Sequence, residues 1–407
     1  MADLALSTQP YPVYVIGAGP GGLAVAACLR RRGVRAVVVE RGEAVGTSWR
    51  GHYDRLRLHT TRRLSGLPGL PIPRASGRWP ARDDFVRYLE RYAEHHELEI
   101  VTGVDTTRVD HAPETLNGPR WLLRGTGGRV LAARSVVVAT GYNHTPHTPD
   151  WPGLDTFTGE LTHARDYRER GPWAGRDVLV VGVGNTGAEI AADLADPHPP
   201  TPGGRTRTRG AATTAPPPAA RVRLAVRTAP HILRRSTLGW PSQRTGILVR
   251  RLPVPLVDRM GRALARVAVP DLTPFGLPRP DGGLYSRVLD GAIPVQDAGL
   301  IAAVRAGRVE PVAAVTGFDG PHALLADGSR VTPEAVIAAT GYRRGLEPLV
   351  GHLHGVLDGH GLPTAHGPDS PAGNPGLHFT GLATPPISGS LRELALEAER
   401  TARALAG

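Results

Sequence analysis

Two stretches of the chain repeat one pattern, in which an apolar run is followed by a glycine-rich turn and a segment of small residues. They read VYVIGAGPGGLAVAACL from residue 13 and VLVVGVGNTGAEIAADL from residue 178. In such a turn one glycine allows the bend, a second lets the backbone approach a pyrophosphate, and a third brings helix and strand together. The glycines are Gly17, Gly19 and Gly22 in the first stretch and Gly182, Gly184 and Gly187 in the second. The repeat predicts an α/β fold with two Rossmann-like dinucleotide-binding domains, whose parallel sheets carry helices on both faces.

The spacing of apolar residues and the positions of glycine and proline also predict the bounds of several elements. An apolar run of four residues predicts a buried strand, and apolar residues at steps of three and four predict a helix. We expect strands at 13–16, 36–39 and 376–382, and helices at about 21–31, 82–94 and 391–405. The helix at 82–94 should bury Phe85, Leu89 and Tyr92.

The residue that ends the second strand of each repeat indicates which dinucleotide binds there. In the first repeat it is Glu40, followed by Arg41, and a carboxylate suits the two hydroxyl groups of an adenosine ribose. In the second repeat it is Arg227, whose guanidinium can pair with a 2′-phosphate in a forked geometry. The pattern therefore predicts FAD in the first domain and NADPH in the second. An ordinary solvated strand end is the alternative interpretation of Arg227.

A shorter repeat, Ala-Thr-Gly-Tyr, closes two further apolar strands at 139–142 and 339–342. Small residues at this position let a ligand approach the carboxyl edge of a parallel sheet, where such folds bind cofactors. Beyond the glycines and the two strand ends, the predicted cofactor-binding residues are Pro20, Trp49, Thr140, Asn185, Thr186, Thr340 and Gly341.

The chain resembles flavoproteins with two dinucleotide sites, in which the last strand and helix return to the first domain, and this resemblance implies the same here. We expect the FAD-binding domain to comprise residues 1–165 and 326–407, and the NADPH-binding domain to comprise residues 166–325. Residues 197–220 are rich in Pro, Thr, Gly and Arg, which predicts a disordered insertion. Residues 230–300 are rich in Pro and Arg and contain short apolar helical patterns, which predicts a lid over the site.

Composition excludes several other classes of function. Cys28 is the only cysteine, so an internal disulfide, a CxxC redox pair and a cysteine-rich zinc site are excluded, and we expect no metal. All 48 basic residues are arginine, which excludes a lysine Schiff base. The net charge of +11 comes without a basic cluster interleaved with aromatics, so we expect no nucleic-acid partner. No apolar run approaches the roughly 20 residues of a membrane span, and the N-terminus lacks a signal-peptide pattern. We expect a cytoplasmic enzyme with no membrane partner, for which a homodimer is one option.

The segment FTGELTHARDY, residues 157–167, fills every fixed position of FxGxxxHxxxY. That motif identifies flavin-containing and N-hydroxylating monooxygenases, whereas the similar motif of Baeyer–Villiger monooxygenases ends in Trp-Pro, where this chain has Tyr167-Arg168. Further segments resemble the YUCCA branch of plant flavin monooxygenases in the same order, over nearly the whole chain. They are YDRLRLH, LPGLPIP, VVVATGYN, WPGLDTFTGE, VLVVGVGNTGAEI and AATGYR.

The resemblance implies a class B flavoprotein monooxygenase with FAD and NADPH as cofactors. In this class NADPH reduces FAD, oxygen adds at the flavin C4a carbon, and the hydroperoxide donates one oxygen atom to a small organic substrate. The partners would be that substrate and O2. The resemblance leaves two reactions open, oxygenation of a heteroatom and oxidative decarboxylation of a 2-oxo acid. Either reaction needs a site that keeps water away from the intermediate.

The resemblance also implies roles for single residues. His163 and Tyr167 are expected on the connection between the cofactor domains, where His163 would position the linker and NADP. The segment 46–49, ending in Trp49, resembles the family's Gly-x-Trp element near the flavin, although core packing would equally explain this tryptophan. His59 aligns with an asparagine beside the flavin ring of animal flavin monooxygenases. We therefore predict a catalytic role for His59, with a structural histidine as the alternative.

Two other functions remain open at this point. One is an NADPH-dependent flavin reductase of a quinone or another small acceptor, and the other is a flavin-binding regulatory module without turnover. Oxygen uptake tied to an oxygenated product would separate the first from a monooxygenase. The lid arginines Arg234, Arg235 and Arg244 could bind a substrate carboxylate.

Overall fold

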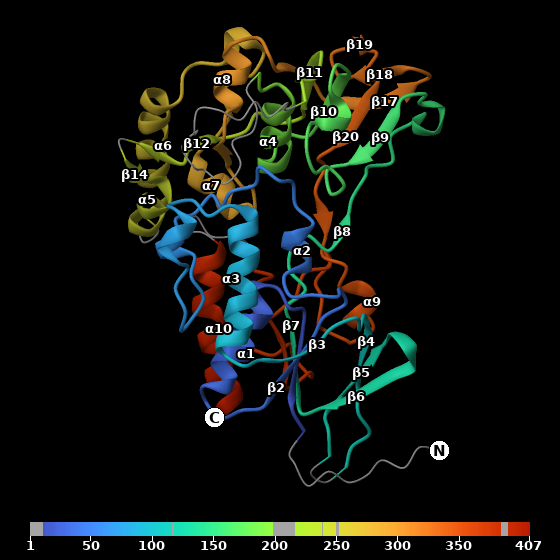
Figure 1. The fold of residues 1–407 in the computed structure, drawn as a ribbon, viewed down its shortest axis with the longest axis vertical. Coiled ribbons are helices and arrows are strands. Elements are labelled where there is room, and N and C mark those ends of the chain that lie inside the picture. Colours follow the sequence, from blue (N-terminus) through green and yellow to red (C-terminus); the bar gives the residue numbers. More distant parts are fainter. Residues whose placement is uncertain (1–10, 116–117, 198–215, 238, 250–251, 384–389) are drawn as a thin grey trace, which may run out of the picture.

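The computed structural model describes residues 11–115, 118–197, 216–237, 239–249, 252–383 and 390–407. It shows two α/β lobes, one above the other in Figure 1, with the lid segment, residues 230–300, at the side of the upper lobe. Residues 198–215, most of the expected insertion, lie outside the described residues. No helix in the described ranges is both long and apolar enough to cross a lipid bilayer.

The lower lobe in Figure 1 is built on a parallel five-stranded sheet in the order β22-β7-β1-β2-β3. Its strands are β1 (Val13–Ile16), β2 (Ala36–Val39), β3 (Glu99–Val101), β7 (Ser135–Val138) and β22 (Leu377–Phe379). The helices of this lobe are α1 (Pro20–Arg30), α2 (Thr47–Arg50), α3 (Arg82–His95), α9 (Glu347–Val350) and α10 (Ser390–Ala406). The predicted elements at 13–16, 36–39 and 82–94 are confirmed, and α1 lies one residue before the predicted bounds.

Because successive side chains of a strand point to opposite faces, the two faces of this sheet pack into two separate hydrophobic cores. Val15, Val38 and Val137 point to a face covered by α1, α3 and α10, where Phe85 and Leu89 are fully buried. The opposite face packs against α9 and a small antiparallel sheet. That sheet comprises β4 (Thr106–His111), β5 (Trp121–Gly125) and β6 (Arg129–Ala133).

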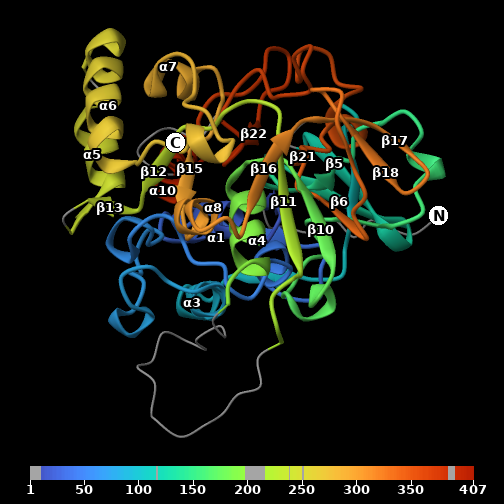
Figure 2. The same ribbon diagram turned by 90° about the horizontal axis from the view of Figure 1, so that it is seen from above.

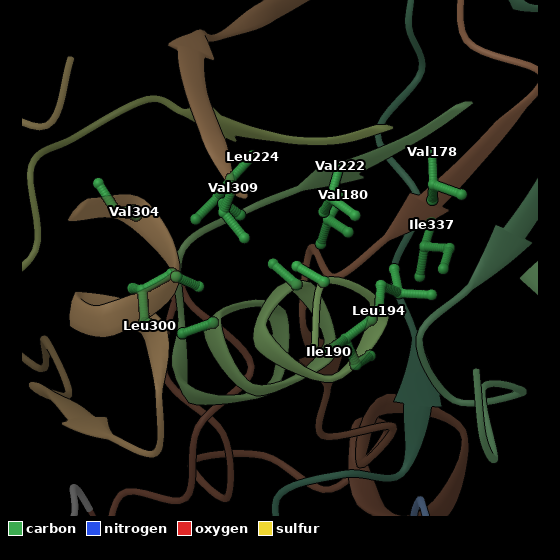
Figure 3. Close-up of a cluster of buried hydrophobic side chains, with 14 of the residues drawn as sticks. Val178, Val180, Ile190, Leu194, Val222, Leu224, Leu300, Val304, Val309 and Ile337 are labelled. Atoms are coloured by element: carbon green, nitrogen blue, oxygen red, sulfur yellow. The ribbon is translucent and has the colours of Figure 1, made fainter. Parts of the chain in front are cut away.

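The upper lobe repeats this design. Its parallel sheet has the order β16-β11-β10-β20-β9, with Val178 of β10 opposite Ala335 of β20. The strands are β9 (Glu160–His163), β10 (Asp177–Val181), β11 (Arg221–Val226), β16 (Glu310–Ala313) and β20 (Ala335–Ala338). On one face Ile190 and Leu194 of α4 (Asn185–Leu194) pack against the valines of β10 and β11, with α8 (Leu300–Arg305) beside them (Figure 3). The other face carries β17 (Val315–Asp319), β18 (His322–Leu325) and β19 (Arg330–Val331). The prediction of two Rossmann-like domains is confirmed.

The two sheets divide the chain differently from the expected bounds. Strands β9 and β20 lie in ranges assigned from sequence to the first domain, 1–165 and 326–407, but both belong to the second sheet. The reason is strand pairing, because β20 pairs with β10 on one side and with β9 on the other. An edge strand such as β9 carries no glycine-rich turn of its own that would assign it from sequence.

Two short strands join the lobes. β8 (Thr145–Pro146) leads into the upper lobe and β21 (Tyr342–Arg343) leads back, and the two pair antiparallel. We call this pair the linker ribbon; in Figure 1, β8 lies between the two lobes.

The described residues of the lid segment fold mainly into three helices. Seen from above in Figure 2, α5 and α6 lie at the outer edge of the molecule. Its elements are β12 (Ile232–Arg234), β13 (Ser236–Thr237), β14 (Trp240–Pro241), α5 (Ser242–Val249), α6 (Val254–Ala268), α7 (Leu284–Leu289) and β15 (Val295–Asp297). Short 3-10 turns occur at Arg62–Leu64, Arg74–Ser76, Thr126–Gly128, Leu154–Thr156, Gly171–Trp173 and Thr273–Phe275.

Candidate active site

The first glycine turn leaves a backbone surface open to a ligand. Gly17 has φ +109°, and a Cβ there would lie 2.7 Å from the carbonyl oxygen of Ala139. A Cβ on Gly22 would lie 1.9 Å from the carbonyl oxygen of Gly17, so this glycine lets α1 approach β1. At Gly19, by contrast, a Cβ would meet nothing within 4 Å. Gly19 precedes α1 and provides no side-chain cap, so the first helical N–H groups remain available to an anion.

The second turn has the same geometry. Gly182 has φ +107°, and its Cβ would lie 2.6 Å from the carbonyl oxygen of Ala339. A Cβ on Gly187 would lie 1.9 Å from the carbonyl oxygen of Gly182, and one on Gly184 would meet nothing within 4 Å. Both turns therefore fit the pyrophosphate of a dinucleotide, with the middle glycine facing open space and a helix N-terminus behind it.

The two strand ends differ in their surroundings. Glu40 is buried, and its two carboxylate oxygens accept the backbone N–H groups of Ala18 at 2.7 Å and Gly42 at 2.9 Å. Arg41 lies next to it and contacts the Nε2 of His144 at 3.1 Å. Arg227 follows β11 directly and is exposed. Each Glu40 oxygen keeps a lone pair that can accept a hydroxyl hydrogen.

The two Ala-Thr-Gly-Tyr turns use their threonines differently. The hydroxyl of Thr140 is buried without a partner among the described residues. The hydroxyl of Thr340 donates to the carbonyl oxygen of His147 and so belongs to the protein's own structure. Gly341 has φ +90°, and its carbonyl oxygen accepts the backbone N–H of His147 at 3.0 Å. Thr140 therefore has hydrogen-bonding capacity left for a ligand, whereas Thr340 uses its hydroxyl internally.

One cavity of about 1360 Å³ connects both turns with the lid segment. The predicted site residues that line it are Gly17, Gly19, Pro20, Glu40, Arg41, Trp49, His59, Thr140, His163, Gly184, Asn185, Thr186 and Gly341. Those outside the lining are Gly22, Gly182, Gly187, Arg227 and Thr340. The lid contributes polar residues, among them Ser242, Gln243 and Gln296, and a larger set of apolar ones: Leu233, Val249, Val257, Met260, Leu264, Leu284, Val288 and Ile293.

The lid arginines do not line the cavity, contrary to the prediction that they bind a substrate carboxylate. Arg235 lies 3.3 Å from Oε1 of buried Glu189, which already supplies its counter-charge. Arg234 and Arg244 are exposed, and the guanidinium of Arg244 stacks over the ring of Trp240 at 5.3 Å. Sequence reasoning failed here because it cannot tell which face of an irregular segment points inward.

Two predicted ligand contacts also hold the structure together. The side-chain amide of Asn185, at the start of α4, donates to the carbonyl oxygen of Pro294 at 3.2 Å and accepts the N–H of Gln296 at 2.7 Å. It therefore ties the second glycine turn to the lid segment. Trp49 packs edge-on against Phe85 with ring centroids 4.5 Å apart while it also lines the cavity. The core packing of this tryptophan is confirmed, and its predicted place near the flavin stays a prediction.

His59 lies at the meeting point of both lobes and the lid. Its Nε2 is 3.4 Å from Oε1 of Glu189 on α4, and its Nδ1 is buried without a partner among the described residues. Burial, together with the nearby charge of Arg235, lowers the pKa of His59 to about 4. The imidazole is therefore neutral at neutral pH.

Glu189 itself is a functional candidate that the sequence did not indicate. Burial raises its pKa to about 7, against the opposing effects of Arg235 and of the Tyr53 hydroxyl, which donates to Oε2 at 3.0 Å. Its partners lie 136 and 46 residues away along the chain, so no local pattern marks the cluster. The available signal was a carboxylate on the apolar face of α4.

The FTGELTHARDY segment positions the second lobe through all four of its fixed residues. Phe157 packs against Phe318 with ring centroids 4.9 Å apart. A Cβ on Gly159 would come within 2.5 Å of the Phe157 ring and 3.0 Å of the carbonyl oxygen of Glu334. Phe157 and Gly159 therefore fix the start of β9 against its neighbours β17 and β20.

The other two fixed residues make their hydrogen bonds within the upper lobe, and the partner of Tyr167, Asp193, also binds Arg55 of the lower lobe. His163 accepts the N–H of Arg165 at Nδ1, 3.0 Å away, and contacts the carbonyl oxygen of Gly341 through Nε2 at 3.2 Å. Both ring nitrogens are thus used by backbone groups, which fixes a neutral tautomer with the proton on Nε2. The hydroxyl of Tyr167 is buried and donates to Oδ2 of Asp193 on α4 at 2.8 Å, and Arg55 binds Oδ1 at 2.8 Å.

Comparison with known proteins places this arrangement in a family. A family model described as pyridine nucleotide-disulphide oxidoreductase matches residues 14–198. The indole-3-pyruvate monooxygenase YUCCA1 of Oryza sativa subsp. japonica is 35% identical over 370 residues, covering 90% of this chain and 85% of the relative.

Solved structures share the fold over nearly the whole chain. The flavin-containing monooxygenase from Stenotrophomonas maltophilia is 23% identical with a TM-score of 0.67, covering 98% of this chain and 99% of that one. OTEMO in complex with FAD and NADP is 16% identical with a TM-score of 0.67, covering 98% and 84%. The structures establish the fold, and the identity to the rice relative establishes the family. The chain is a flavin-dependent oxidoreductase that belongs to the class B flavin monooxygenases, in the YUCCA-like branch.

Proposed function

We propose that the chain binds FAD in the first glycine turn and NADPH in the second, and oxygenates a small substrate in the space between them and the lid segment. The observation that carries the proposal is the pair of matching turns, with Gly19 and Gly184 facing the same cavity. The OTEMO structure, which holds both FAD and NADP, has the same fold. When bound, reduced FAD supplies the electrons and the site at which O2 is activated.

Residues around the first turn fit the demands of FAD. Glu40 can accept hydrogen bonds from the ribose hydroxyls, and the unpartnered hydroxyl of Thr140 can bond to the cofactor. Beyond β11, Arg227 supplies a guanidinium where a 2′-phosphate would distinguish NADPH from NADH. The first lobe would thus be the FAD domain and the second lobe the NADPH domain.

The remaining site residues would protect the reacting centre rather than transfer protons. His59 is neutral because its pKa is about 4, so it does not bring a titrating proton into the cavity at neutral pH. The apolar side chains that α6 and α7 contribute to the opposite wall would disfavour water there. His163 acts as a positioning residue, because both its ring nitrogens are bound to backbone groups.

The relatives' activity and the apolar wall favour a 2-oxo acid with an apolar body as substrate. The rice relative is named for indole-3-pyruvate. In the proposed reaction a 2-oxo acid, O2, NADPH and a proton give the carboxylic acid shortened by one carbon, CO2, NADP⁺ and water. One oxygen atom enters the acid and the other becomes water. Oxygenation of an amine or a sulfide would use the same cofactors.

The test is a screen of NADPH consumption with oxygen uptake and product mass spectrometry against 2-oxo acids, amines, sulfides and ketones. We expect one O2 consumed per NADPH and one oxygenated product formed with a 2-oxo acid. NADPH oxidation by a quinone without oxygen uptake would instead identify a reductase. Failure of NADPH to bleach the flavin in the absence of air would reject both enzymatic functions.

A further inference from the structure

Arg344 is a cation of the cavity wall that lacks a counter-charge. It follows the linker ribbon directly, and Arg41 and Arg344 are the arginines that line the cavity in the described ranges. Its Nη1 donates to the carbonyl oxygen of Tyr142 at 2.9 Å, and its guanidinium carbon lies 4.0 Å above the ring of the same tyrosine. No carboxylate in the described part of the chain pairs with it.

Other partly buried arginines of this protein have carboxylate partners. Arg55 binds Asp193 at 2.8 Å, and Arg82 binds Asp54 at 2.6 Å. Partners of this kind raise the pKa of both guanidinium groups, although burial opposes the shift. For Arg344 the direction is reversed, because burial lowers its pKa and only Tyr142 acts against it. A partly buried charge in this state is unfavourable until an anion binds it.

Tyr142 adds a second unsatisfied group at the same place. Its hydroxyl and the Nε of Arg344 are both buried without hydrogen-bond partners among the described residues. Tyr142 also lines the cavity. Burial raises the pKa of Tyr142 to about 12, so its hydroxyl stays protonated and can donate. The nearby Glu397 accepts the N–H of Gly381 at 2.9 Å through Oε2, and it makes no hydrogen bond with either of these two donors.

We infer that Arg344 and Tyr142 form an anion-binding subsite of the cavity, built to hold a phosphate or a carboxylate group of a bound ligand. The subsite rests on the proposed function only for the source of that anion. One source is the pyrophosphate of FAD, since Tyr142 ends the turn that begins at Ala139, whose carbonyl oxygen would lie 2.7 Å from a Cβ on Gly17. The other source is the carboxylate of the substrate.

The first arm of the test measures flavin binding to the flavin-free protein by fluorescence quenching. FAD carries the pyrophosphate and riboflavin does not. If FAD supplies the anion, Arg344→Gln weakens FAD binding roughly 10- to 100-fold, the effect of one charge-assisted hydrogen bond, and leaves riboflavin binding unchanged. Arg344→Lys keeps the charge and should recover part of the loss.

The second arm uses the FAD-loaded protein and follows ligand-induced changes in the flavin absorption spectrum. The probes are phenylpyruvate, which has a carboxylate, and phenylacetone, which does not. If the substrate supplies the anion, Arg344→Gln weakens phenylpyruvate binding roughly 10- to 100-fold and phenylacetone binding remains as in the wild type. Tyr142→Phe should weaken the same ligand, to a smaller degree.

Arg343→Gln is the matched control, because Arg343 is the exposed neighbour on β21 and does not line this cavity. Thermal unfolding of each variant separates a loss of fold from a loss of binding. If Arg344→Gln is folded and binds all four probes as the wild type does, the subsite is refuted while the proposed function stands. If the wild type binds no flavin at all, the proposed function fails.

Discussion

The substitution Gly184→Ala separates a glycine needed by a ligand from one needed by the fold. At Gly184 φ is −73° and ψ is −179°, a conformation that alanine adopts freely, and the added Cβ meets nothing within 4 Å. At Gly187 the added Cβ would lie 1.9 Å from a backbone oxygen, so α4 must move away from β10. The first change should disturb binding, and the second should disturb folding.

The stability cost of Gly184→Ala is small because two effects oppose each other. Replacing glycine by alanine in a compatible conformation gains about 0.4–1 kcal/mol through the unfolded chain. Alanine is a poorer N-cap than glycine, by an amount of similar size. We therefore expect the free energy of unfolding to change by less than about 1 kcal/mol. Gly187→Ala should lower it by about 1–3 kcal/mol or more.

The loss of NADPH affinity in Gly184→Ala follows from the position of the added methyl group, which faces the cavity. If the NADPH pyrophosphate lies against this turn, the methyl group prevents at least one charge-assisted hydrogen bond to the helix N-terminus, worth about 1.5–3 kcal/mol. Kd for NADPH should then rise roughly 10- to 100-fold.

Anaerobic stopped-flow reduction of the bound flavin over a range of NADPH concentrations measures this Kd. Gly359→Ala is a matched control, since its Cβ also meets nothing within 4 Å and Gly359 lies outside the cavity. A Gly184→Ala protein that binds NADPH within about twofold of the wild type would refute the placement of the pyrophosphate.

Four further predictions concern single side chains. Arg227→Ala should weaken NADPH by roughly 10- to 100-fold and leave NADH almost unchanged; an unaltered preference between them in steady-state kinetics would contradict this. His59→Ala should still bind FAD but divert NADPH oxidation to hydrogen peroxide, and a peroxide assay showing full coupling would count against the role of this histidine. Tyr167→Phe removes a buried hydrogen bond to Asp193 and should lower the free energy of unfolding in urea by about 1–3 kcal/mol; an unchanged midpoint would show that this contact is not stabilising. Burial raises the pKa of Glu189 to about 7, so the folded protein binds this proton more tightly than the unfolded chain does. The free energy of unfolding of the wild type should therefore fall as the pH rises from about 5 to 7, by up to about 1.4 kcal/mol per pH unit. Glu189→Gln should lose that contribution, and parallel stability curves for the two proteins would disprove it.

Local sequence signals were enough to locate the elements that carry glycine turns. The predicted strands at 13–16 and 36–39 match β1 and β2 residue for residue, and α1 differs by one position. These elements are defined by apolar runs and by glycines whose conformations no other residue adopts easily. Their information is contained within a few neighbouring residues.

Contacts between residues far apart along the chain could not be predicted in this way. Glu189 meets Tyr53, and Arg344 meets Tyr142, 136 and 202 residues away along the chain. Each partner alone is an ordinary polar residue, and only the folded structure brings the two partners together and buries them. The same holds for Arg235, whose counter-charge lies on α4 rather than on a ligand.

The linker ribbon has a consequence for how such an enzyme could be assembled or rebuilt. Pro146 and Tyr342 pair directly, so the chain enters and leaves the upper lobe at one point. All five strands of the lower sheet lie outside the interval 147–341. The upper lobe is therefore a cassette inserted into the chain of the lower lobe. If the upper lobe binds NADPH as proposed, exchanging that cassette at the ribbon should change the electron donor without altering a strand pairing of the lower sheet.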